Sequence, residues 1–171
     1  MNRILLFTFI LSIGLTWKGV AQNNDLIRKA NLTVRASAIV NDNLRMLTIR
    51  NIDLIAPAVE EDRILVSPLT SPYAGLFKII GNPRARIRIT FLQRETLVET
   101  NDEIGKVQAE YNLSAAFEDL QNQSTLLDVG EVNVNLSEKG ILFVWLGADL
   151  DLSDAVPGIY QSEFTVELEY I

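Results

Sequence analysis

The chain has no cysteine and no histidine among its 171 residues. It therefore lacks the commonest zinc ligands, thiol nucleophiles and neutral-pH general bases. Without cysteine it forms no disulfide and carries no N-terminal lipid attached through a thiol. P-loop, G-x-G-x-x-G and G-x-S-x-G motifs are also missing. We expect a protein that is not an enzyme and that has no cofactor and no metal; a carboxylate pair hydrolysing glycosides is the remaining catalytic alternative.

Positive charge is scarce. Fifteen Lys and Arg residues stand against 22 Asp and Glu residues, which gives a formal net charge of −7. Such a surface repels nucleic acid phosphates and anionic lipid headgroups. We expect neither as a partner.

Long apolar runs are absent except at the N-terminus. Residues 4–16 are mostly large and apolar, follow Arg3, and end before Lys18. This run is shorter than the ~20 residues that a membrane-spanning helix needs. Small residues at Gly19 and Ala21 then suit signal peptidase, so residues 1–21 are predicted to be a cleaved signal peptide. The protein would be exported to the periplasm, cell surface or medium, without membrane insertion after cleavage; an uncleaved anchor is the alternative.

Beyond the leader, the sequence has little helical periodicity. Short runs rich in Val, Ile, Thr and aromatics alternate apolar with polar residues, and Gly, Pro, Asn and Asp separate them. The runs cover residues 31–40, 45–55, 63–66, 73–80, 84–92, 107–117, 131–136, 140–147 and 160–170. This pattern predicts an all-β fold, an antiparallel immunoglobulin-like β-sandwich over residues 41–171, preceded by an N-terminal strand segment at 22–40. A closed β-barrel is the competing architecture.

Three of these runs have distinctive faces. Residues 141–146 are apolar on both faces, which indicates a central strand. In the run at 107–117 alternate residues through Phe117 share one apolar face. In the last run Ser162 is the only weak inward position. Tyr111 and Trp145 are expected in the core because they lie on apolar faces.

Two charged clusters have more than one interpretation. Asp149, Asp151 and Asp154 are expected in a loop, where they form either a solvated acidic turn or oxygen ligands for calcium. Arg84, Arg86 and Arg88 would form a basic row along one strand. That row either protects a sheet edge or contacts an acidic face of a neighbouring copy, for which the candidates are Glu163, Glu167 and Glu169.

A family resemblance is carried by three stretches. They are residues 32–40 leading into 47–54 (LTIRNIDL), residues 74–81 (AGLFKIIG) and residues 157–166 (PGIYQSEFTV). The layout resembles a domain-of-unknown-function family of secreted bacterial β-sandwich proteins related to spore coat protein U and the archaic chaperone–usher pilin subunits. Such pilins end in an alternating strand with a penultimate aromatic residue and a glycine fourteenth from the end. Tyr170 and Gly158 occupy these two positions.

The resemblance implies a fold that is pilin-like and a subunit that lacks one strand. An N-terminal segment of the next subunit fills the resulting groove by β-strand addition. The implied donor residues are Leu32, Val34, Ala36, Ala38 and Val40. The implied contacts for a subunit or chaperone are Gly158, Tyr160, Phe164, Val166, Leu168 and Tyr170. This chain departs from many relatives in lacking a disulfide and in having an alanine-rich donor.

The sequence thus predicts a structural subunit of a filament, fimbria or surface layer. Its partners would be other copies or related subunits, with a periplasmic chaperone and usher. The N-terminal strand pairing within its own chain is the alternative to pairing with a neighbour. The second functional hypothesis is a monomeric, secreted or periplasmic module that binds or adheres to glycan or protein. Such a module would require an exposed aromatic patch. Tyr73 is the candidate for that patch if Tyr111 and Trp145 are core residues.

Overall fold

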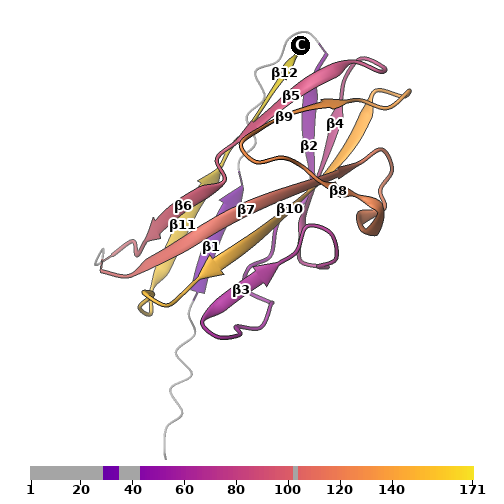
Figure 1. The fold of residues 1–171 in the computed structure, drawn as a ribbon. Coiled ribbons are helices and arrows are strands. Elements are labelled where there is room, and N and C mark those ends of the chain that lie inside the picture. Colours follow the sequence, from indigo (N-terminus) through magenta and orange to yellow (C-terminus); the bar gives the residue numbers. More distant parts are fainter. Residues whose placement is uncertain (1–28, 35–42, 102–103) are drawn as a thin grey trace, which may run out of the picture.

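The computed structural model describes residues 29–34, 43–101 and 104–171, and for residues 29–34 it describes the backbone alone. Strands account for most of this part of the chain, and the predicted all-β, sandwich-like fold is confirmed (Figure 1). Nearly all of the strand pairs are antiparallel. Among these residues no helix has the length and apolar character that crossing a bilayer requires.

The larger sheet forms one wall of the fold. Its strand order is β2 (Arg45–Arg50), β4 (Gly75–Ile80), β10 (Ile141–Asp151), β7 (Lys106–Ala116) and β6 (Arg94–Val98). The short strand β3 (Arg63–Val66) pairs with the end of β10, and β8 (Thr125–Leu126) pairs with β7. Strand β10 is therefore central, as its apolar residues on both faces predict.

The smaller sheet has the order β12 (Val166–Tyr170), β5 (Arg86–Phe91) and β9 (Glu131–Asn135). Strand β11 (Ile159–Phe164) continues into β12 across Thr165 and pairs with β1 (Lys29–Val34). A bridge between Glu99 and Tyr160 joins the end of β6 to the start of β11. Along this side the two sheets curve toward each other like half of a barrel (Figure 1).

One continuous stretch serves both sheets. Strand β5 lies in the smaller sheet, and after Leu92 and Gln93 the chain enters the larger sheet as β6. The sequence pattern predicts a single strand at residues 84–92 and none at 94–98, so β6 was missed. The reason is that residues 94–98 (RETLV) bury only Leu97 fully, and one apolar residue gives no alternation.

The core lies between the sheets and follows the predicted alternation. Ile87, Ile89 and Phe91 of β5 point inward while the residues between them are partly exposed. On β10 the inward residues are Leu142, Val144, Leu146, Ala148 and Leu150. Burial of each large aliphatic side chain contributes ~1.5–3 kcal/mol, so these two strands provide a substantial part of the stability.

Trp145 is buried on the opposite face of β10, apart from the main core. The loop at Pro68–Ser71 and the short 3-10 helix η1 (Gln121–Gln123) are tied together near this face. Gln121 Nε2 donates to the carbonyls of Pro68 and Ser71 at 3.1 and 2.9 Å, and Ser114 Oγ donates to that of Pro68 at 3.1 Å. The predicted burial of Trp145 is confirmed.

Two details of the predicted strands are wrong. Phe117, expected to point inward at the end of β7, is 57% exposed because β7 ends at Ala116 and the chain leaves the sheet. The strand expected at residues 45–55 ends at Arg50. There the Asp53 carboxylate accepts hydrogen bonds from the N–H groups of Ile55 and Ala56 at 2.9 and 3.0 Å, which turns the chain away from the sheet.

Candidate functional site

The candidate site consists of the two consecutive C-terminal strands, β11 and β12, and the strands around them. Of the residues that the sequence singled out there, Tyr160, Phe164, Val166 and Leu168 are all buried in the core of their own chain. Gly158 and Tyr170 are half-buried. Strands β11 and β12 therefore complete the hydrophobic core, and their backbone edges are what remains for pairing.

Gly158 lies directly against a buried carboxylate. A Cβ added to Gly158 would overlap Cγ of Glu99 and would lie 2.7 Å from its Oε1 and 2.8 Å from its Cδ. Glu99 is 3% exposed and accepts hydrogen bonds from the backbone and side-chain nitrogens of Asn101 at 2.8 and 3.0 Å, and from Ile159 N at 3.3 Å. The glycine at the fourteenth position from the end thus has a packing role inside this chain.

The hydroxyl of Tyr160 closes the loop that precedes β11. It accepts a hydrogen bond from Val156 N and donates one to Val156 O, each at 2.8 Å. Gly105 packs so closely that any side chain there would overlap this hydroxyl. The start of β11 is therefore held by two glycine contacts, at Gly158 and Gly105.

A polar chain, buried at Tyr111 and Ser162 and half-buried at Glu95, links two strands of the larger sheet to β11. Tyr111 Oη donates to Ser162 Oγ at 3.1 Å, and Ser162 Oγ donates to the carboxylate of Glu95. Burial raises the pKa of Tyr111 to about 12, since the charged phenolate would be poorly solvated there. Ser162, the one weak inward position in the sequence, is thus the residue that connects β6, β7 and β11.

Beside these polar residues, aromatic side chains pack along β11. The ring of Phe164 lies 4.8 Å from that of Tyr111 and 6.0 Å from that of Phe91, measured between centroids, and both pairs are tilted. At the far end Tyr170 Oη accepts a hydrogen bond from Asn82 N at 2.9 Å. Each predicted aromatic residue of the C-terminal strand therefore has a partner within the same chain.

Strand β1 runs parallel to β11 along its outer edge. The register joins six residue pairs, from Lys29 with Ile159 to Val34 with Phe164. Of the predicted donor residues, Leu32 and Val34 belong to β1, and Ala36, Ala38 and Val40 lie outside the described residues. In this structure the N-terminal strand pairs in cis, with the C-terminal strand of its own chain.

The predicted basic row is not at an edge, and the edge-protection interpretation is wrong. Arg88 is in β5, the middle strand of the smaller sheet, with its Nε 3.1 Å from Glu131 and its Nη1 2.8 Å from Glu169. Arg84 precedes that strand and pairs with Glu138 at 2.6 Å. Arg88 therefore neutralises an acid on each neighbouring strand, and Glu169 has its cation within the chain.

The predicted acidic loop is largely a strand. Asp149 and Asp151 belong to β10, and only Asp154 lies in the turn that follows. Asp149 binds Arg63 through two hydrogen bonds, at 3.1 and 2.5 Å, and this contact raises the pKa of Arg63. The pKa of Asp151 is lowered by hydrogen bonds from Ser153. These three aspartates are thus not gathered in one loop.

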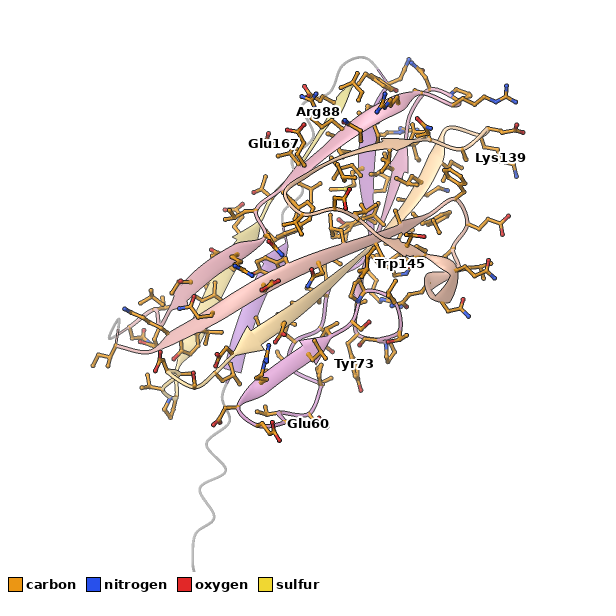
Figure 2. All side chains as sticks on the ribbon, viewed as in Figure 1. Glu60, Tyr73, Arg88, Lys139, Trp145 and Glu167 are labelled. Atoms are coloured by element: carbon orange, nitrogen blue, oxygen red, sulfur yellow. The ribbon has the colours of Figure 1, made fainter. Side chains whose placement is uncertain are left out.

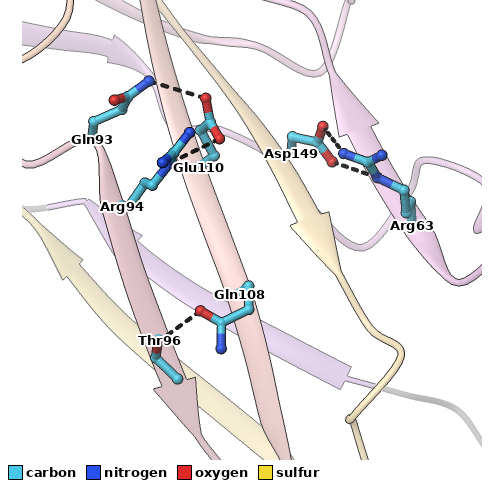
Figure 3. A network of polar contacts seen from close by, with 7 residues as sticks. All are labelled: Arg63, Gln93, Arg94, Thr96, Gln108, Glu110 and Asp149. Atoms are coloured by element: carbon cyan, nitrogen blue, oxygen red, sulfur yellow. Dashed lines mark hydrogen bonds and ion pairs between the residues drawn. The ribbon is translucent and has the colours of Figure 1, made fainter.

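Polar contacts line the outer face of the larger sheet (Figure 3). Glu110 on β7 accepts hydrogen bonds from Gln93 Nε2 at 3.0 Å and from Arg94 Nε at 3.1 Å. Further along, Thr96 Oγ1 donates to Gln108 at 2.7 Å. These cross-strand pairs fix the register of β6 on β7 and leave that face polar.

Two hollows carry exposed aromatic residues. Tyr73 is 38% exposed and lies at the same end of the molecule as Glu60 (Figure 2). It lines an open hollow of about 830 Å³ with Arg63 and Leu65. The second hollow, of about 570 Å³, opens beside β9 and is lined by Phe117, Leu120, Leu127 and Val134 among others. Of the three residues that the sequence suggests for an exposed aromatic patch, only Tyr73 is exposed, because Tyr111 and Trp145 are buried.

Sequence reasoning missed Glu95, Glu99 and Phe117 as members of these sites. Acidic residues in an exposed-looking strand give no signal of burial, because their partners Ser162 and Gly158 are more than fifty residues away. The alternation of β7 extends in the sequence through Phe117, whereas the strand ends at Ala116. Within the polar chain, Ser162 can be recognised in the sequence as a polar residue at an inward position.

No protein-family model matches the chain, and no curated protein is significantly similar to it. The resemblance to spore coat protein U and the archaic pilins therefore stays a prediction from the sequence.

Proposed function

We propose that this protein is a secreted, non-enzymatic structural subunit of an extracellular filament, fimbria or surface layer, assembled by β-strand addition. The observation that supports this best is the pairing of β1 with β11. An N-terminal strand lies along the C-terminal strand over six residue pairs, and among the described residues it pairs with no other strand. The same strand of another copy can occupy this edge with the same backbone hydrogen bonds.

The exchange is energetically reasonable. A six-residue ladder makes about five hydrogen bonds, each contributing ~0.5–1.5 kcal/mol net, so the strand stabilises its partner by several kcal/mol. That is a large part of the ~5–15 kcal/mol that holds an ordinary domain together. A subunit with this edge unfilled would need a chaperone at first and a neighbouring subunit afterwards. The proposed partners are therefore other copies or related subunits, a periplasmic chaperone and an usher.

The test removes the N-terminal segment and supplies it again as a peptide. A variant lacking residues 22–40 should lose assembly, measured by electron microscopy and light scattering, and should bind a synthetic peptide of residues 24–40. A peptide with Leu32→Pro and Thr33→Pro should not bind, since one of the two prolines removes a ladder N–H. The matched control, Asn24→Pro, lies outside the paired residues and should bind normally.

Two results would contradict the proposal. One is an intact protein that stays monomeric at high concentration and unfolds cooperatively without partners. The other is a deletion variant that assembles as well as the intact chain.

A monomeric glycan-binding or protein-binding module is the second candidate. It is favoured by Tyr73, whose ring is exposed at the rim of a hollow beside Arg63 and Asp149. A glycan array should then show binding that Tyr73→Ala abolishes. The subunit hypothesis expects no such signal.

A further inference from the structure

The smaller sheet has an open edge at β9. This strand pairs with β5 alone among the described residues (Figure 1). Hydrogen bonds from Phe91 N to Gly130 O at 2.9 Å and from Leu136 N to Ala85 O at 2.8 Å define which residues face β5. Because pairing alternates along an antiparallel strand, the N–H and C=O groups of Asn133 and Asn135 point to the opposite side. That side is a ready template for another strand.

Unlike most open edges, this one carries little protection. Natural proteins guard a free edge with charges, prolines or bulges. The sequence of β9 is EVNVN, and its single charge, Glu131, lies 3.1 Å from Arg88 of the adjacent strand. Neutralised in this way, Glu131 does not repel an approaching strand.

Exposed apolar side chains lie close to the same edge. Phe117 and Leu120 are 57% and 41% exposed and share a hollow with Val134 and Asn135 of β9. Val129, 55% exposed, lies two residues before the start of the strand, and its carbonyl accepts a hydrogen bond from Glu131 N. Apolar side chains gathered beside an unpaired edge indicate a surface that a partner covers.

We propose that the partner is β9 of a second copy, paired antiparallel about a two-fold axis at Asn133. In this register Asn133 faces its own counterpart, Glu131 faces the partner's Asn135, and Val132 faces the partner's Val134. No like charges meet, and an asparagine amide is placed to donate to the Glu131 carboxylate. The two smaller sheets then form one continuous six-stranded sheet, joined by about four backbone hydrogen bonds.

The other edge of the smaller sheet provides the contrast. Strand β12 also pairs with β5 alone among the described residues. A two-fold pairing centred on Leu168 would place Glu167 opposite the partner's Glu169. Arg88 offsets part of the charge of Glu169, as it does that of Glu131, but at the β12 edge an acid still faces an acid, which disfavours pairing with its own copy. The charges therefore select β9, and the inference does not depend on strand addition at β11, which uses neither edge.

The chain has no cysteine, so a single introduced thiol is a clean probe. The Cα atoms of a hydrogen-bonded antiparallel pair are ~5.5 Å apart, within the range for a disulfide. Purified from cells expressing the full coding sequence, Asn133→Cys should form a disulfide dimer under mild oxidation. The matched variant Glu167→Cys, exposed on the other edge, should remain unlinked.

Sedimentation provides the second measurement. The unmodified protein should show a concentration-dependent dimer, and Asn133→Lys should weaken it at least roughly tenfold by bringing two like charges together at the axis. Asn51→Lys, the same substitution at an exposed position that follows β2 of the larger sheet, should leave the dimer intact, and circular dichroism should show that both variants fold. A monomer at all concentrations, equal cross-linking of both cysteine variants, or a dimer that Asn133→Lys does not weaken would each overturn the proposal.

Discussion

Replacing Gly158 with alanine tests how the C-terminal strand is held. The new methyl group would overlap Cγ of Glu99 and approach Oε1 and Cδ to 2.7 and 2.8 Å. Glu99 cannot move aside freely, because it is buried and accepts hydrogen bonds from Asn101 and Ile159. Overpacking of this kind costs ~1–3 kcal/mol, and a displaced buried carboxylate adds a similar amount. We expect a loss of about 2–4 kcal/mol in the free energy of unfolding.

The assay is urea denaturation in a double-mutant cycle with Glu99→Ala. Removing the glutamate side chain takes away the atoms that the methyl group meets, so Gly158→Ala should then cost less than ~1 kcal/mol. The single variant should also lower the melting temperature by roughly 5–12 °C. If Gly158→Ala costs the same in both backgrounds, the clash with Glu99 is not why this position is glycine, and the reasoning fails.

Three further predictions concern the core and the smaller sheet. The pKa of Tyr111 is about 12 in the folded protein against about 10 in the unfolded chain. The free energy of unfolding should therefore fall by ~2–3 kcal/mol as the pH rises from 10 to 12. Denaturation measured across this range should show the fall, and the variant Tyr111→Phe should not show this pH dependence. Fluorescence of Trp145, the only tryptophan beyond Trp17, should be blue-shifted and resist acrylamide quenching, and emission typical of exposed indole would contradict its placement. Arg88→Gln, which removes two cross-strand ion pairs, should cost ~0.5–2 kcal/mol at low salt and less in 1 M salt; a salt-independent effect would argue against these pairs.

The sequence predicts those parts of the fold in which burial is encoded locally. Strand β5 alternates cleanly and β10 is apolar on both faces, so their places in the sheets follow from period and composition. The inward Ser162 could also be recognised, because it interrupts an otherwise regular apolar face. In each case the information lies within one strand.

What the sequence does not reveal depends on distant partners. The passage of the chain from β5 to β6 between sheets has no local signal at Leu92 and Gln93. Nor does alternation show that β1 would pair parallel to β11, or that Glu99 would be buried against Gly158. Pairing and carboxylate burial are decided by residues far along the chain.

The order of the strands has a consequence for how the chain matures during synthesis. Residues 159–170 contain β11 and β12, which pair with β1 near the N-terminal side and with β5 in the middle of the sequence. Until these residues leave the ribosome, one backbone edge of β1 and one of β5 lack the strand that they pair with in the folded protein. The domain therefore cannot close before residues 159–170 have been synthesised, and until then the earlier strands remain accessible to chaperones.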